Sequence, residues 1–117
     1  MSDFPIIKRA IPLQRHQVGE YSVTLLGDVE SGDTVDYRYI LAFIEEGESQ
    51  PTFFVCCERN RSAKTEGAYR LRIVSSALSE VLGVSDDWKD ADRFVSEGLK
   101  LGMQALGLTS EHPYRVM

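Results

Sequence analysis

The feature that most constrains this chain is a series of short runs rich in β-branched and aromatic residues between residues 20 and 75. Turn-forming sequences separate these runs at residues 30–34, 46–51 and 60–67. None of these connections is long enough for the crossover that a parallel pair of strands requires. The runs therefore predict an antiparallel β-meander. The predicted strands cover residues 20–29, 35–45, 52–58 and 68–75.

The segments on either side of these runs are less regular. Residues 6–15 could add an edge strand, because Pro12 has no amide hydrogen to donate within the centre of a sheet. Residues 75–82 could continue the last strand or form a short helix that ends at Gly83. The spacing of their apolar residues favours the helix. We therefore expect four to five strands in total.

The strongest helix pattern spans residues 88–106, which follow a group of acidic residues and precede Gly107, a suitable C-cap. A stripe of small residues that includes Gly98 and Gly102 runs along this helix between two apolar groups. A glycine inside a helix costs about 1 kcal/mol relative to alanine. Another element should therefore approach the stripe closely. We expect this element to be the sheet; a second helix, from this chain or from another copy, is the alternative.

Together these elements predict an α+β fold: an antiparallel β-meander of four to five strands followed by a long C-terminal helix packed on one sheet face. The length of 117 residues predicts a single domain, residues 1–117. The first eight residues lack the features of a signal peptide, and no run approaches the ~20 apolar residues of a membrane helix. We therefore expect a cytoplasmic protein with no membrane partner.

No motif in the sequence assigns an enzymatic activity. His16 and His112 lie far apart, and Cys56 and Cys57 are adjacent instead of having the C-x-x-C spacing of a metal site. We therefore expect no metal, no cofactor and no catalytic residue. A catalytic pair of Cys57 and His16 is the less favoured alternative, because cysteines within strands are commonly buried and inert. Both cysteines should be reduced, and at least one should be buried.

The charges are unevenly distributed along the chain, whose net charge is -5. Residues 17–50 carry eight acids and one base, whereas residues 59–72 carry five bases and one acid. A basic segment beside aromatic rings can bind single-stranded nucleic acid, with cations on phosphates and rings stacked on bases. Alternatively, its arginines pair with neighbouring acids such as Glu58 or Asp36. The candidate nucleic-acid-binding residues are Arg59, Arg61, Lys64, Arg70 and Arg72.

The second face of the predicted sheet combines apolar and arginine side chains, which is typical of recognition surfaces. The N-terminal arm or residues 76–82 could cover this face, or a second copy of the chain could. Large apolar patches are seldom left exposed on a monomer, and this favours a homodimer or another homo-oligomer. The candidate interface residues are Arg38, Ile40, Ile44, Phe54, Gly98 and Gly102.

The sequence therefore predicts a small, non-catalytic cytosolic interaction module that associates with itself and could also bind a protein partner. The alternative is a single-stranded nucleic-acid-binding domain that uses residues 59–72. The acidic net charge disfavours this alternative, because it repels a polyanion.

Overall fold

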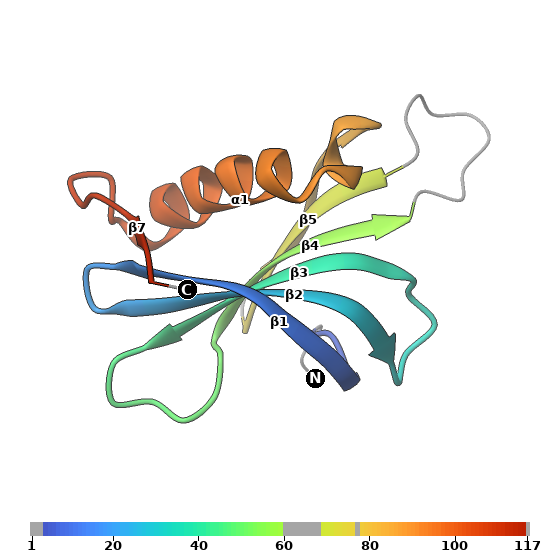
Figure 1. The fold of residues 1–117 in the computed structure, drawn as a ribbon, viewed down its shortest axis with the longest axis horizontal. Helices are drawn as coiled ribbons and strands as arrows, with labels where there is room; N and C mark the ends of the chain where they lie inside the picture. Colours follow the sequence, from blue (N-terminus) through green and yellow to red (C-terminus); the bar gives the residue numbers. More distant parts are fainter. Residues whose placement is uncertain (1–3, 60–68, 77, 117) are drawn as a thin grey trace.

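The computed structural model describes residues 4–59, 69–76 and 78–116. In these residues, seven strands form one antiparallel sheet, and one α-helix lies across a face of it (Figure 1). The spatial order is β6-β5-β4-β3-β2-β1-β7, so β1 to β6 form a continuous meander. This arrangement confirms the predicted α+β class and the antiparallel sheet. The strands are β1 (Ile7–Val18), β2 (Tyr21–Ser31), β3 (Tyr37–Glu45), β4 (Phe53–Arg59), β5 (Tyr69–Ser75), β6 (Ser79–Ser85) and β7 (Tyr114–Arg115).

The prediction of four to five strands was wrong, because the sheet has seven. Strand β6 occupies much of the segment for which the apolar spacing favoured a helix, and it continues through Gly83. It pairs with β5 from Val74 opposite Ser79 to Tyr69 opposite Ser85. In so short an apolar run, local periodicity does not distinguish a strand from a helix, and the pairing partner decides. Strand β7 has two residues, too few to leave a pattern in the sequence.

The helix α1 (Ala91–Leu106) has 16 residues and is shorter than the predicted helix over 88–106. A 3-10 turn, η1 (Asp87–Lys89), precedes it, and the extended backbone of Asp90 separates the two. The Asp90 carboxylate accepts hydrogen bonds of 2.9 and 3.3 Å from the amides of the second and third residues of α1. Asp90 is therefore the N-cap. Gly107, with a φ of 72°, forms the predicted C-cap.

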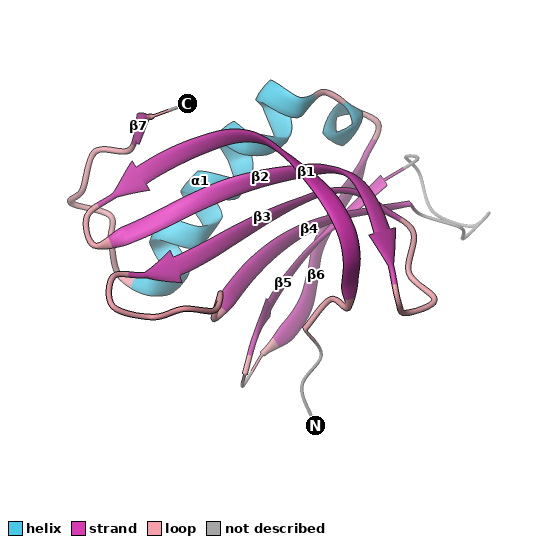
Figure 2. Cartoon of the chain, turned by 60° about the horizontal axis from the view of Figure 1, so that its bottom comes forward, coloured by secondary structure: helices cyan, strands magenta, loops and turns pink. Residues whose placement is uncertain are grey.

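The sheet curves around α1, and the main core fills the space between them (Figure 2). Phe94, Val95 and Leu99 of α1 are buried there. Gly98 and Gly102 are buried as well, so the stripe of small residues faces the sheet, as expected. The sheet contributes Val18, Val23, Leu25, Leu41, Phe43, Phe53, Val55, Cys57, Leu71 and Ile73 to this core.

A second apolar cluster lies on the opposite face of the sheet. The N-terminal segment covers part of it: the ring of Phe4 meets Phe54 edge-on, with 5.1 Å between ring centroids. Of the two intramolecular coverings considered for this face, the structure therefore shows the N-terminal arm. The buried members of the cluster are Tyr37, Ile40, Ala42, Phe54, Cys56 and Val74.

Asp33, in the connection between β2 and β3, holds the N-terminal segment in place over the second cluster. Its carboxylate accepts hydrogen bonds from the amide of Ile6 at 3.1 Å, from the amide of Val35 at 3.0 Å and from the hydroxyl of Tyr37 at 3.0 Å. Burial alone would raise the pKa of Asp33, but these hydrogen bonds favour the ionised form and hold the pKa below its usual value. One side chain thus joins the N-terminal arm to the β2–β3 connection.

An irregularity in β3 alters which face two tyrosines occupy. Tyr37 pairs with Glu58, whereas Tyr39 pairs with Cys57, so Arg38 is an extra residue in the ladder. Regular alternation along a strand would place both tyrosines on one face, but the extra residue places them on opposite faces. Tyr37 belongs to the second cluster and Tyr39 packs against the main core. Such a bulge also redirects the side chain of the extra residue.

The glycine stripe yields the first prediction. A Cβ on Gly98 would lie 2.9 Å from Cδ2 of Leu41, and a Cβ on Gly102 would overlap the ring of Phe43. Gly102→Leu should therefore lower the free energy of unfolding by about 1–3 kcal/mol through overpacking. Ala105→Leu, at an exposed position of α1, is the control and should have little effect. Urea unfolding measures both, and a more stable Gly102→Leu variant would contradict close packing at the stripe.

The second prediction concerns acid stability. Because the pKa of Asp33 is lowered in the folded state, its stabilising contribution is present near neutral pH and is lost as the pH falls below about 4. Asp33→Asn should lower the free energy of unfolding by about 1–2 kcal/mol at pH 7. The deficit should shrink toward pH 3, because the unfolded wild type takes up a proton on this carboxylate more readily than the folded protein does, which removes its stabilising contribution.

The exposed acid Glu30 provides the control, since Glu30→Gln should change stability little at either pH. Unfolding curves measured at pH 7 and pH 3 test both variants. A deficit for Asp33→Asn that stays constant across this range would show that the charge of Asp33 does not stabilise the fold.

Candidate functional site

Cys56 and Cys57 do not form a reactive site. Both are buried and unpaired, which confirms the expectation of reduced cysteines within the sheet. Burial raises the pKa of both thiols, that of Cys57 to about 12, so neither forms appreciable thiolate at neutral pH. The Cys57 thiol donates to the carbonyl of Trp88 at 3.3 Å, while the ring of His16 forms its hydrogen bond with Gln14. This geometry does not support the Cys57–His16 alternative.

Two of the five candidate nucleic-acid-binding residues contact one buried acid. Glu58 has a fully buried side chain, and each of its carboxylate oxygens accepts a 2.6 Å hydrogen bond: Oε1 from Nε of Arg70 and Oε2 from Nε of Arg72. Arg72 also donates to the hydroxyl of Ser79 on β6. The side chains of Arg70 and Arg72 remain 40% and 16% exposed. Glu58 neutralises one of the two positive charges of this arginine pair.

Of the other three candidates, the structure describes Arg59 alone and does not bring it together with this pair. Arg59 is exposed at the end of β4 and has no carboxylate within 4 Å among the described residues. Arg61 and Lys64 lie outside the described residues.

The six candidate interface residues lie on different surfaces. Gly98 and Gly102 are covered by the sheet on its concave side. Ile40 and Phe54 are buried in the cluster on the opposite face, and Ile44 is partly exposed. Of the six, only Arg38 is exposed. These residues do not form one continuous patch on the chain.

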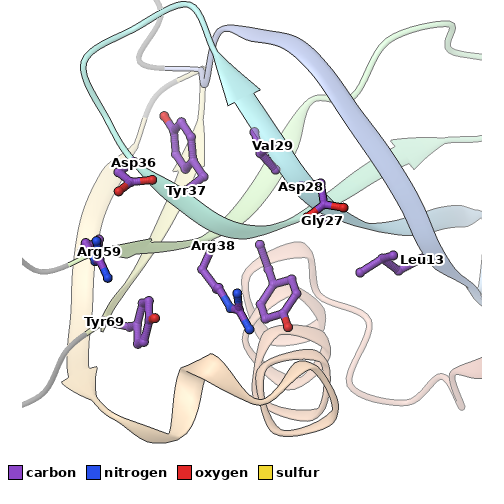
Figure 3. Close-up of a pocket in the computed structure, with 10 residues that line it drawn as sticks. Leu13, Gly27, Asp28, Val29, Asp36, Tyr37, Arg38, Arg59 and Tyr69 are labelled. Carbon is purple, nitrogen blue, oxygen red and sulfur yellow. The ribbon is translucent and has the colours of Figure 1, made fainter.

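A surface cavity of about 450 Å³ lies where β2, β3, β4 and β5 approach the start of α1 (Figure 3). We call it the arginine–tyrosine cavity. Arg38, Arg59 and Tyr69 project around its opening from three adjacent strands. Sequence reasoning picked out both arginines for other reasons but did not place them together. Its lining residues are Leu13, Gly27, Asp28, Val29, Asp36, Tyr37, Arg38, Tyr39, Arg59 and Tyr69.

Tyr39 forms a fixed wall of this cavity. Its ring stacks on the buried ring of Phe94, with 5.8 Å between centroids, and its hydroxyl donates to the carbonyl of Lys89 at 3.3 Å. The guanidinium of Arg38 lies 5.1 Å from the centroid of the Tyr39 ring, within the range of a cation–π contact. Arg59 and Tyr69 face each other as partners in the ladder of β4 and β5. The bulge at Arg38 therefore directs a cation toward a preformed aromatic surface.

The outer edge of β6 is a second distinct feature. Strand β6 ends the strand order of the described sheet, so no described strand pairs with this edge. Leu78, Val81 and Leu82 are exposed beside it, at 40%, 46% and 41%. The pattern of residues 75–82 did not reveal this edge, because it suggested a helix.

The opposite edge of the sheet is better protected against pairing. Its outer strand β1 contains Lys8, Arg9 and Pro12, and its ladder with β2 has three register shifts. The short strand β7 covers His16 and Gln17. Charged residues, proline and bulges are the usual protections of an edge strand. Strand β6 has one charged residue, Glu80, no proline and a single register shift, so it is the less protected edge, although Ile11 and Leu13 of β1 are exposed as well.

Across the described part of the chain, no three His, Cys, Asp or Glu side chains lie close enough to hold a metal ion. No helix in that part has the length and apolar character needed to cross a membrane. Comparison with known proteins found no matching family model, no matching curated protein and no matching solved structure.

Glu58 gives the third prediction. Glu58→Gln removes the negative charge between two arginines, one of them largely buried, and should lower the free energy of unfolding by about 3–5 kcal/mol. The matched control is Asp87→Asn, which breaks the exposed 3.1 Å ion pair with Arg93 and should cost less than about 1 kcal/mol. Thermal and urea unfolding measure both. Equal, small effects would show that the buried carboxylate is dispensable.

Proposed function

We propose that the protein is a small, non-catalytic cytoplasmic interaction module that forms a homodimer by pairing the β6 edges of two copies. The observation that carries this proposal is the contrast between the two edges of the sheet. An edge strand presents unpaired N–H and C=O groups to a further strand, and β6 adds exposed apolar side chains to these groups. Pairing two β6 strands would continue the sheet from one copy into the next.

The sequence of β6, Ser79–Ser85, suits antiparallel pairing with itself. A two-fold axis at Leu82 sets Glu80 opposite Val84 of the second copy, so the two acids do not face each other. Leu82 has no partner residue in β5, because the register shifts at this point. Its exposed side chain would then pack against the second copy's Leu82. The remaining pairs are Ser79 with Ser85 and Val81 with Gly83.

The fourth prediction tests this dimer through its solution mass. Light scattering should give twice the 13.2 kDa chain mass for the wild type and the monomer mass for Leu82→Lys, because two lysines would meet at the axis. Ile11→Lys places the same charge at an exposed position of β1 and should remain dimeric. A wild-type monomer at high concentration, or a dimeric Leu82→Lys variant, would refute edge pairing.

Salt separates this proposal from single-stranded nucleic-acid binding. Two copies of net charge -5 repel each other, so added salt should strengthen the dimer or leave it unchanged. An oligonucleotide held by residues 59–72 would instead dissociate as salt rises, with a log–log slope of about −0.7 per phosphate contact. The pairing of Arg70 and Arg72 with Glu58 favours the dimer over this alternative. Oligonucleotide binding with that salt dependence would favour the alternative.

A further inference from the structure

We propose that the arginine–tyrosine cavity binds a small phosphate monoester that carries a flat ring, such as a mononucleotide. The cavity volume of about 450 Å³ lies within the range of about 300–1,000 Å³ that is common for small-molecule sites. This site is separate from the β6 edge residue Leu82 and uses different side chains.

The first argument is the pair of arginines without an acidic partner. Among the described residues, neither Arg38 nor Arg59 has a carboxylate oxygen within 4 Å. Arg70 and Arg72, by contrast, both contact Glu58. Each guanidinium can donate two parallel hydrogen bonds to an anion. A phosphate monoester offers three terminal oxygens and about two negative charges, enough for two arginines. A carboxylate offers only two oxygens, so two guanidinium groups favour the phosphate.

The second argument is the aromatic wall. Phe94 and the carbonyl of Lys89 hold Tyr39 in place, so its ring does not have to be ordered when a ligand binds. Tyr69 adds a second, half-buried ring to the lining. Flat heterocycles stack on such rings regardless of their identity. The ring of the ligand would lie against Tyr69, because Phe94 and Arg38 already pack against the ring of Tyr39, while its phosphate contacts the arginines.

The third argument is the pair of acids that also line the cavity, Asp28 and Asp36. They make the cavity unsuitable for a ligand that is negatively charged throughout, such as a polyphosphate. Asp28 is exposed, and its backbone has a φ of 46°. Its carboxylate can accept hydrogen bonds from the hydroxyl or amino groups of a ligand. A mononucleotide combines such donors with one phosphate and one flat ring.

The fifth prediction tests this site by calorimetric titration of the full chain with AMP, adenosine and inorganic phosphate. AMP should bind at least about tenfold more tightly than either of the other two, because each lacks one half of the recognised chemistry. AMP that binds no better than inorganic phosphate would overturn the role of the ring. AMP that binds no better than adenosine, or does not bind at low salt, would overturn the phosphate site.

Variants assign the binding to the cavity. Arg38→Gln and Arg59→Gln should each lower the affinity for AMP about tenfold or more. Lys100→Gln, which removes an exposed charge elsewhere on α1, should leave the affinity unchanged. Tyr69→Ala should bind AMP more weakly than Tyr69→Phe does, because only the phenylalanine keeps the ring.

Thermal unfolding checks that each variant is folded. If AMP affinity is the same in both arginine variants and the wild type, AMP binds elsewhere and the proposal is wrong. The solution mass reports on the β6 dimer independently, so failure of one proposal leaves the other intact.

Discussion

The close approach of α1 to the sheet is the contact on which the rest of the structure depends. It is possible because Gly98 and Gly102 have no side chains, so Leu41 and Phe43 can occupy the space beside the helix backbone. The sheet curves around the helix, and most of the buried hydrophobic side chains lie in the space between them. The same contact places the start of α1 beside Tyr39, which is how the arginine–tyrosine cavity obtains its fixed wall.

Local patterns predicted the elements whose residues repeat regularly. The strands around residues 20–29, 52–58 and 68–75 and the C-cap at Gly107 were predicted because period and capping are short-range properties. Strand β6 was missed because seven residues of mixed polarity acquire their conformation from pairing with β5. The bulge at Arg38 was missed for a similar reason: it depends on how β3 fits β4, and no residue at that point requires it.

The candidate site was less predictable than the fold, because charge along the sequence does not show which charges are already paired. The basic segment 59–72 looked like one surface. In the structure, Glu58 holds Arg70 and Arg72, while Arg59 faces a different region together with Arg38 from β3. Glu58 lies next to the segment and was considered as a partner for its arginines. No sequence pattern indicated that Arg38 and Arg59 line the same cavity, since 21 positions separate them in the sequence.

The two edges of the sheet show why an unprotected strand suggests a function. Edge strands expose hydrogen-bonding groups that any extended chain can use, and proteins usually blunt them with charge, proline, bulges or a covering element. Strand β1 has all of these, including the short cover of β7. The ladder of β6 with β5 also contains a register shift, but β6 has a single charged side chain, and its Val81 and Leu82 are exposed. An apolar edge of this kind would promote aggregation unless a defined partner occupied it. A second copy related by a two-fold axis would satisfy that requirement and would end the association at two, since each copy would then expose only its protected β1 edge.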